Sequence, residues 1–294
     1  MISVASIVTA GIFMITLGLI LAVILSIANK KLYVYEDPRI EQVNDMLPQA
    51  QCGACGEAGC RPFAEAVVTG RKNPAQCTVN SPEGNARIAR FIGVTMAKQE
   101  KFVARLACAG GSHVAYKRAN YQGLTTCQAA SVVSGGGKGC SWGCLGLGDC
   151  AKACTFDAIY MDKFGLPIVI EDKCTACNDC VVACPKDLFS LHPVSHKLFV
   201  ACKSEDQGDQ AEQECEVACT ACGKCVADAP QGLIAIKNNL AAIDYELNDL
   251  ASRTPIERCP TGAIVWIDSK LGTTRSSRGR EAKKIIRIEP LPLI

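Results

Sequence analysis

The sequence is poor in aromatic residues, in histidine and in net charge, and each shortage argues against a class of protein. Aromatic residues make up 5% of the 294 residues, which argues against a large conventional hydrophobic core. Three histidines disfavour a haem protein. A formal net charge of +2 gives no electrostatic reason to expect nucleic acid as a partner. No GxGxxG motif follows a predicted strand, so a nicotinamide or flavin site on this chain is not expected.

Two short patterns that bind ligands in other proteins have simpler interpretations here. The run Gly135–Gly139 (GGGKG) is too short for a phosphate-binding loop and has no Ser or Thr after its lysine, so we expect a turn that leads into Cys140. His192 and His196 are four residues apart and would share one face of a helix. Pro193 lies between them, however, which makes an exposed loop the expected structure.

The amino terminus has the features of a membrane span. Ile2–Ala28 contains no charged residue, and Lys30 and Lys31 follow it. A helix of about 20 apolar residues is enough to cross a bilayer. A cleavable signal peptide would carry its basic residues before the apolar run, whereas here they follow it. We therefore expect a single-pass anchor over residues 1–29 in the cell (inner) membrane, with the rest of the chain on the cytoplasmic side by the positive-inside rule.

Cysteine, by contrast, is abundant, with 20 residues in the chain. Such a content indicates a disulfide scaffold in a short secreted chain and a metal or redox protein otherwise. This chain is not short and has no cleavable signal peptide, and most of its cysteines are grouped a few residues apart. The pattern predicts metal centres, whose binding also stabilises small modules that lack a large core.

The first cysteine group lies in LPQAQCGACGEAGC and at Cys77. Its glycines leave the backbone room to wrap an iron–sulfur cluster and to direct amides at the sulfides. Zinc is the alternative, although zinc ribbons usually have two separate CxxC knuckles. Helices are expected over Pro62–Val68 and Asn85–Lys101. The predicted ligands of cluster 1 are Cys52, Cys55, Cys60 and Cys77.

From Cys127 onward the cysteines repeat with an offset of 75 residues and no gap. Such self-similarity indicates a duplicated module. The matched pairs are Cys127 and Cys202, Cys140 and Cys215, Cys144 and Cys219, Cys150 and Cys225, and Cys184 and Cys259.

The first copy contains CTACNDCVVACP, the spacing of bacterial two-cluster ferredoxins. In that arrangement the fourth cysteine of each run ligates the other cluster. The predicted ligands of cluster 2 are Cys140, Cys144, Cys150 and Cys184, and those of cluster 3 are Cys154, Cys174, Cys177 and Cys180.

The second copy lacks one of these two ligand sets. The positions of the cluster 3 cysteines are taken by Ala229, Asp249, Ser252 and Pro255. Because all four ligands are replaced together, we expect the second copy to hold one cluster. The predicted ligands of this cluster 4 are Cys219, Cys222, Cys225 and Cys259.

Four cysteines remain, and their long separations match no motif: Cys108, Cys127, Cys202 and Cys215. They are either the ligands of a fifth cluster or spare buried thiols, with Cys215 competing with Cys222 as a ligand. Four [4Fe–4S] clusters are therefore expected and a fifth stays open. Iron content separates the two cases, at about 16 or about 20 atoms per chain.

Together these features predict an α+β protein with a single N-terminal transmembrane helix, a small mostly helical [4Fe–4S] domain and two tandem ferredoxin-like modules. The expected boundaries are 1–29 for the anchor, 30–105 for the first cluster domain, 106–190 for the two-cluster module and 191–269 for the one-cluster module. Residues 270–294 form a basic tail, expected to be solvated and disordered, with contact to anionic lipid or an acidic partner as the alternative.

A membrane anchor, an LPxAxCGACGxxGC motif and paired ferredoxin modules follow one another in this order. The order resembles the B subunit of the Rnf complex, the membrane-bound ferredoxin:NAD⁺ oxidoreductase that couples electron transfer to sodium or proton translocation. The likeness covers nearly the whole chain. Because the CGxCGxxxC domain alone also occurs in corrinoid iron–sulfur proteins, the anchor and the repeats carry the resemblance.

The resemblance implies an electron-transfer subunit of an oxidoreductase and translocase, with no substrate-converting site of its own. Its clusters would receive electrons from soluble reduced ferredoxin and relay them into flavoprotein and integral-membrane subunits. The implied partners are thus these Rnf-type subunits, ferredoxin and the lipid bilayer, without nucleic acid. The alternative is a free-standing membrane-anchored polyferredoxin that serves other reductases without ion pumping.

Overall fold

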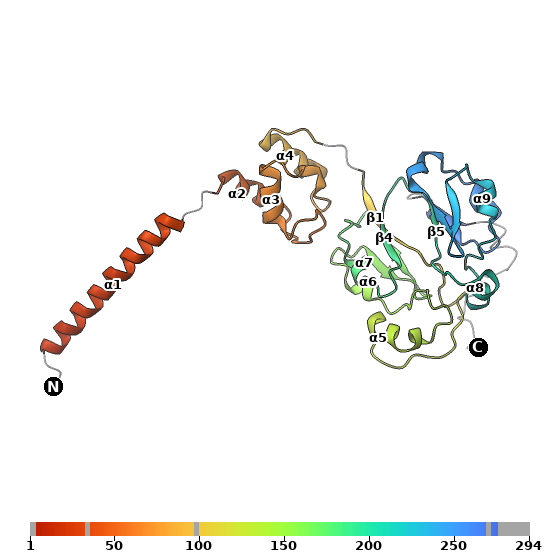
Figure 1. Ribbon diagram of the computed structural model, residues 1–294, viewed down its shortest axis with the longest axis horizontal. Coiled ribbons are helices and arrows are strands. Elements are labelled where there is room, and N and C mark those ends of the chain that lie inside the picture. Colours follow the sequence, from red (N-terminus) through yellow and green to blue (C-terminus); the bar gives the residue numbers. More distant parts are fainter. Residues whose placement is uncertain (1–3, 33–35, 97–99, 269–271, 276–294) are drawn as a thin grey trace.

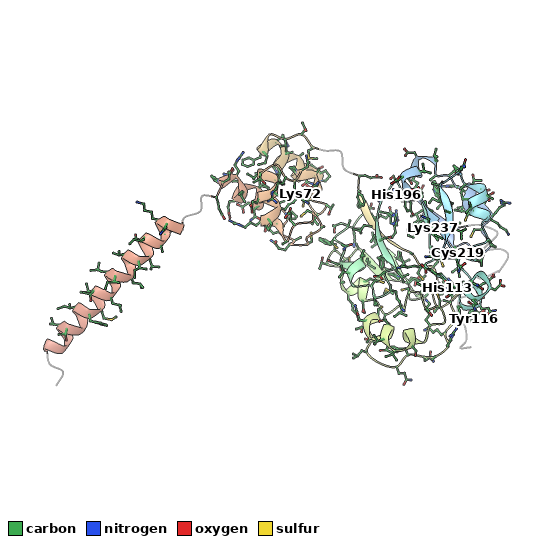
Figure 2. All side chains as sticks on the ribbon, in the orientation of Figure 1. Lys72, His113, Tyr116, His196, Cys219 and Lys237 are labelled. Carbon is green, nitrogen blue, oxygen red and sulfur yellow. The ribbon has the colours of Figure 1, made fainter. Side chains whose placement is uncertain are left out.

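The computed structural model describes residues 4–32, 36–96, 100–268 and 272–275. Helix α1 extends away from the rest of the chain, α2, α3 and α4 gather in a separate body, and the strands lie in a third part (Figure 1). The small helical body carries Lys72, and Cys219 lies in the strand-containing part (Figure 2).

Helix α1 (Val4–Leu32) is the one described helix that is long and apolar enough to cross a membrane. Its segment Gly11–Lys31 has a mean hydropathy of 2.7 and is not buried against the rest of the chain. At about 1.5 Å per residue this segment spans about 30 Å, the thickness of a hydrocarbon core. Lys30 and Lys31 lie in its last turn, where positive charge favours the helix dipole.

The helical body, which we call the N-terminal cluster domain, follows local capping signals. Asp37 accepts a hydrogen bond from the amide of Arg39 at the start of α2, and Ser81 accepts one from Gly84 at the start of α4. Helix α4 ends at the left-handed Gly93, earlier than the expected end at Lys101. The helices are α2 (Pro38–Asp45), α3 (Cys60–Val68), the short 3-10 helix η1 (Pro74–Gln76) and α4 (Pro82–Ile92).

The first module contains two antiparallel strand pairs, β1 with β4 and β2 with β3. Two short helices follow the cysteine-rich loops, and a further helix and a 3-10 turn lie in a segment between β1 and β2. Its elements are β1 (Phe102–Leu106), α5 (Cys127–Val132), η2 (Ser134–Gly137), α6 (Asp149–Lys152), β2 (Ile159–Met161), β3 (Pro167–Val169), α7 (Asp179–Val182) and β4 (Phe189–Pro193).

The second module repeats this plan, with β5 paired to β8 and β6 paired to β7, and β9 added beside β8. Its elements are β5 (Leu198–Val200), α8 (Gly208–Glu214), α9 (Lys224–Asp228), β6 (Ile234–Lys237), β7 (Leu240–Ile243), η3 (Tyr245–Leu250), α10 (Thr254–Glu257), β8 (Ile264–Asp268) and β9 (Gly272–Arg275).

The 75-residue offset of the cysteines is also present in the secondary structure. Helix α7 begins at residue 179 and α10 at 254, and strand β4 begins at 189 and β8 at 264, so both pairs differ by 75. Cysteines lie within the buried core of each module, beside Val103 and Phe189 in the first and beside Leu198 and Leu233 in the second. Each core is therefore built partly from the cysteines themselves.

Strand β1 pairs with β4, and the expected boundary between residues 105 and 106 falls inside β1. Two further expectations differ from the structure. His192 lies in β4 and not in an exposed loop, because its ring packs on Phe199 and Tyr245. Residues 272–275 of the expected tail pair with β8, and residues 276–294 lie outside the described part of the chain.

Candidate metal centres

All twenty cysteines lie in the part of the chain that the structure describes, and every one of them is a free thiol. Most are buried or half-buried, and Cys222 alone among them is exposed. Buried free thiols in such number are available as metal ligands. Their grouping in space therefore tests which of them can share a centre.

The first pocket is lined by the cysteines predicted for cluster 1: Cys52, Cys55, Cys60 and Cys77. Polar contacts fasten the loops that carry them. The amide of Cys60 donates to Oε1 of Gln51 (2.9 Å), Nζ of Lys72 donates to the carbonyl of Cys55 (2.8 Å), and Nδ2 of Asn85 donates to the carbonyl of Cys77 (2.9 Å). These contacts fix the segments that carry three of the four thiols around one space.

The cysteines predicted for cluster 3 also come together. Cys180 interacts electrostatically with Cys154, Cys174 and Cys177. Backbone amides point at two of the sulfurs, from Ala158 to Sγ of Cys154 (3.3 Å) and from Ala104 to Sγ of Cys174 (3.5 Å). Hydrogen bonds of this kind favour a thiolate and tune the potential of a cluster bound to it.

The pocket expected for cluster 2 differs in one residue. It is lined by Cys127, Cys144, Cys150 and Cys184. The expected member Cys140 lines another pocket, so the four cysteines gathered here differ from the expected set by one residue. The reason is the placement of α5: the amide of Gln128 donates to Oδ2 of Asp149 (3.1 Å) at the start of α6, which brings the thiol of Cys127 beside that of Cys150.

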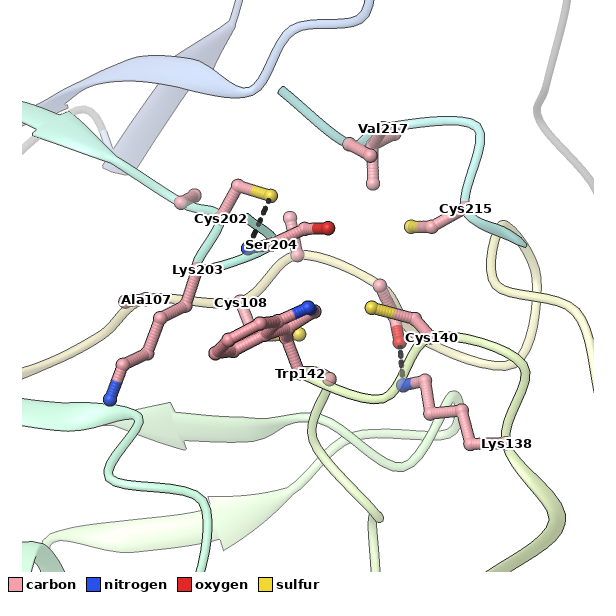
Figure 3. A pocket seen from close by; sticks show the side chains of 15 residues that line it. Ala107, Cys108, Lys138, Cys140, Trp142, Cys202, Lys203, Ser204, Cys215 and Val217 are labelled. Atoms are coloured by element: carbon pink, nitrogen blue, oxygen red, sulfur yellow. Dashed lines mark hydrogen bonds between the residues drawn. The ribbon is translucent and has the colours of Figure 1, made fainter. Parts of the chain in front are cut away.

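Cys140 instead lines a pocket with three of the four leftover cysteines: Cys108, Cys140, Cys202 and Cys215. Figure 3 shows the sulfurs of this group around a common space, with the indole of Trp142 across one side. Two isolated β-bridges, Ala115 with Cys215 and Lys117 with Lys138, hold the segments that carry Cys140 and Cys215 against the same short stretch of chain.

The cysteines expected for cluster 4 line one pocket together: Cys219, Cys222, Cys225 and Cys259. Its loop reads CTACGKC and matches CTACNDC of the cluster 3 loop. Ala221 and Ala176 occupy the same position in the two loops, and both have left-handed backbone angles, with φ of 51° and 56°. Such a conformation costs an alanine about 1 kcal/mol, so its occurrence in both loops marks a constrained functional turn.

The donor type of the four-cysteine pockets suits an iron–sulfur cluster. Four of the five groups each line a pocket with four cysteines. Four cysteine thiolates are the usual ligands of a [4Fe–4S] cluster. The donor sets therefore fit iron–sulfur clusters.

Burial keeps many of these thiols protonated until a metal binds. Desolvation disfavours a bare thiolate, so a bound cation is needed to stabilise the charged form. Cluster insertion must then release protons and stabilise the fold at the same time. Burial raises the pKa of Cys144, Cys150, Cys180, Cys202 and Cys215 to about 12.

Two family models match the chain. A model described as an Fe-S cluster domain covers residues 47–79, which contain the first pocket. A model described as a 4Fe-4S binding domain covers residues 167–189, which contain the CTACNDC loop. The chain therefore binds [4Fe–4S] clusters.

Curated relatives are similar over most of the chain. The B subunit of the Na⁺-translocating ferredoxin:NAD⁺ oxidoreductase complex of Acetobacterium woodii is 42% identical, over 84% of this chain and 74% of that protein. The chain belongs to the family of Rnf-type B subunits. The B subunit of the proton-translocating complex of Clostridium ljungdahlii is 37% identical over 90% of this chain and 94% of that protein. For the B subunit of the ion-translocating oxidoreductase complex of Methanosarcina acetivorans the values are 36%, 84% and 94%.

Within this Rnf-type protein, the interpretation from sequence missed the place of Cys127 and Cys140. A short sequence similarity could have paired Cys108 with Cys202. Cys108 follows VARLA and Cys202 follows KLFVA, so each comes after an apolar strand and an alanine. The resemblance is short, and the 75-residue register pairs Cys202 with Cys127 instead.

Proposed function

We propose that this chain carries electrons from reduced ferredoxin to the flavoprotein and integral-membrane subunits of an Rnf-type ferredoxin:NAD⁺ oxidoreductase that translocates sodium ions or protons. The observation that carries the proposal is the set of pockets, each lined by four cysteines, in a chain that also has an apolar helix. The names of the relatives from Acetobacterium woodii and Clostridium ljungdahlii support the same reaction.

Three of the ligand sets that we assign follow the pockets, and the set of cluster 3 follows the electrostatic contacts of Cys180. Cluster 1 is held in the N-terminal cluster domain, clusters 2 and 3 in the first module, and cluster 4 in the second. The ligands are Cys52, Cys55, Cys60 and Cys77 for cluster 1; Cys127, Cys144, Cys150 and Cys184 for cluster 2; Cys154, Cys174, Cys177 and Cys180 for cluster 3; and Cys219, Cys222, Cys225 and Cys259 for cluster 4.

The protein's own part in the chemistry is to hold the clusters and to set their reduction potentials. A bound [4Fe–4S] cluster supplies one-electron transfer without a change in the covalent bonds of the chain. The amide of Leu188 donates to Sγ of Cys184 (3.5 Å), and comparable donors serve Cys154 and Cys174. Neither a general base nor a nucleophile is required.

The thiol of Cys222 is exposed, so cluster 4 has a ligand at the surface of the second module. Gly223, which has no side chain, follows Cys222 and precedes α9, so the loop leaves the backbone beside Cys222 open to a partner. Helix α1 would keep the pockets close to the membrane subunits, with the side of Lys30 and Lys31 facing the cytoplasm.

The test compares membranes with the complete complex and membranes that lack this chain. Reduced ferredoxin is the electron donor, NAD⁺ is the acceptor, and sodium or proton uptake into vesicles is recorded in parallel. We expect both NADH formation and ion uptake to disappear without the chain and to return when it is restored.

A Cys222→Ala variant provides the matched intermediate case, since it alters one ligand set and leaves α1 unchanged. It should reduce NADH formation and ion uptake by the same factor. If the chain instead purified without membrane flavoproteins and its loss left ferredoxin-dependent ion uptake unchanged, the free-standing polyferredoxin would be the correct function.

A further inference from the structure

Assigning four ligand sets leaves four cysteines, and they are the ones that share a pocket. Two of them, Cys108 and Cys140, belong to the first module, and the other two, Cys202 and Cys215, belong to the second. The N-terminal pocket is likewise lined by four cysteines. The group therefore has the same donor type as a pocket on which the family model for an Fe-S cluster falls.

The four cysteines are related by the internal repeat. Cys108 lies two residues after the end of β1, and Cys202 lies two residues after the end of β5, the corresponding strand. Cys140 and Cys215 are separated by the 75-residue offset of the repeat. Each module thus contributes the same two positions to one shared pocket.

One substitution between the modules explains why Cys202 is free for this role. In the second module Cys222 completes the set of Cys219, Cys225 and Cys259. The equivalent position in the first module, 75 residues earlier, is Leu147, and there Cys127 completes the set. Cys202, which the offset pairs with Cys127, is therefore not needed by its own module.

Polar groups around the pocket are suited to thiolates. The amides of Ser204 and Cys219 donate to Sγ of Cys202, over 3.5 and 3.3 Å, and the first of these contacts is drawn in Figure 3. The amide of Cys144 donates to Sγ of Cys108 over 3.4 Å. The ammonium group of Lys138 lies at the edge, where it donates to the carbonyls of Gly110 (2.5 Å) and Cys144 (2.6 Å).

We infer that Cys108, Cys140, Cys202 and Cys215 ligate a fifth iron–sulfur cluster that joins the two ferredoxin-like modules. The inference rests on the proposed function, because it takes the other four sets to be iron–sulfur ligands. The site lies between clusters 2 and 4, since Cys108 accepts from the amide of a cluster 2 ligand and Cys202 from the amide of a cluster 4 ligand. The ligand sets of the two modules then form one continuous series.

The experiment counts iron and acid-labile sulfide in the full-length chain, purified without oxygen in detergent. The chain without substitutions should contain about 20 iron atoms. Cys140→Ala and Cys215→Ala should each contain about 16, although the two residues lie in different modules. Their double variant should also contain about 16, because both substitutions remove the same cluster.

The matched control is the double variant of Cys127→Ala with Cys215→Ala, which changes the same number of thiols. It should contain about 12 iron atoms, because it removes two different clusters. The opposite order, with the Cys140 pair losing more iron than the Cys127 pair, would overturn the grouping. Equal loss of all iron in both double variants would also overturn it, because the pockets would then not be separate sites.

Failure of the inference can be distinguished from failure of the proposed function. A chain with about 16 iron atoms that keeps them all in Cys215→Ala would overturn the fifth cluster and leave the other four in place. A colourless chain with zinc in place of iron would overturn the proposed function itself. EPR spin counting of the reduced chain gives a second readout, in which Cys140→Ala and Cys215→Ala should lose the same signal.

Discussion

The backbone amide of Cys219 donates a hydrogen bond to Sγ of Cys202 over 3.3 Å, and the two cysteines line different pockets. A single peptide unit therefore connects a ligand of the second module to the group shared by both modules. Cys144 and Cys108 repeat the relationship on the other side, over 3.4 Å. A substitution at one pocket should therefore alter the properties of the cluster in the neighbouring pocket. The charge of Lys138, which lies between two pockets, is the first target.

Lys138 should raise the reduction potential of the two clusters beside it. Its side chain lines the shared pocket and donates to the carbonyl of Cys144, a residue of the cluster 2 pocket. For a charge about 6 Å away at an effective dielectric constant of about 20, the effect is on the order of 100 mV. We expect Lys138→Met to lower the potentials of these clusters by that order in an EPR-monitored redox titration.

Two variants serve as controls for that titration. Lys138→Arg keeps the charge and should keep the potentials close to their original values. Lys237→Met removes an exposed charge that lines neither pocket and should change them little. A drop in potential for the arginine variant as large as that for the methionine variant would mean that packing, and not charge, is responsible.

His192 should make the chain less stable as the pH falls from 6.5 towards 4. Burial, together with the nearby charges of His196 and Arg105, lowers the pKa of His192 from 6.5 to about 4. In this interval the unfolded chain binds a proton that the folded chain does not, so stability decreases as the pH decreases. His192→Gln should flatten this dependence when melting temperatures are compared at pH 7 and pH 5.

The unchanged chain is measured in the same way as a control. Any loss of clusters in acid affects both the unchanged chain and His192→Gln, so it does not contribute to the difference between their pH slopes. His196 stacks on Tyr245 with ring centroids 4.2 Å apart and contacts His192 over 3.3 Å, so this aromatic group lies where β4 meets the second module. Identical pH slopes for His192→Gln and the unchanged chain would contradict the predicted role of His192.

The buried ion pair between Arg105 and Glu171 should tie β1 to the first module. Its N–O distance is 2.5 Å, and the two side chains are 8% and 16% exposed. Glu171→Leu leaves the guanidinium buried with its partner removed, so we expect the free energy of unfolding to fall by about 3–5 kcal/mol. Urea titration followed by the visible absorbance of the clusters measures this loss.

A double variant distinguishes loss of the pair from loss of packing. Arg105→Leu combined with Glu171→Leu removes both charges and should recover most of the lost stability. At the exposed pair of Arg61 and Glu36, by contrast, Glu36→Leu should cost less than about 1 kcal/mol. If Glu171→Leu and the double variant lost the same free energy of unfolding, the unpaired charge of Arg105 would not be the cause of the loss.

Removal of the clusters should unfold the soluble part of the chain while α1 stays helical. Cysteines belong to the buried cores, as Cys60 does beside Phe63 and Ile88 in the N-terminal cluster domain. A body of this size has little other apolar surface to bury. Helix α1 satisfies its backbone within itself and needs no cluster. Treatment with an iron chelator and oxidant should therefore abolish near-ultraviolet circular dichroism and retain part of the far-ultraviolet helical signal.

Much of the architecture followed from local sequence. The apolar run before Lys30, the helix over Pro62–Val68 and the 75-residue offset of the cysteines were readable because each depends on neighbours in the chain. The longer helix expected up to Lys101 was not found, because Gly93 adopts the left-handed conformation that ends α4. The expected boundary between residues 105 and 106 falls inside β1, because a strand is recognised by its partner and β4 lies more than 80 residues later.

The ligand sets divide in the same way. Thiols that are two or three residues apart, such as Cys174, Cys177 and Cys180, must lie near one another whatever the fold, so their sharing of a centre could be derived from spacing alone. Cys127 and Cys140 are subject to no such constraint, because long segments separate them from their partners. The contact of Gln128 with Asp149 decides the place of Cys127, and it exists only once the first module has folded. The bridge of Ala115 with Cys215 places Cys140 beside its partners, and it exists only once the two modules have folded against each other.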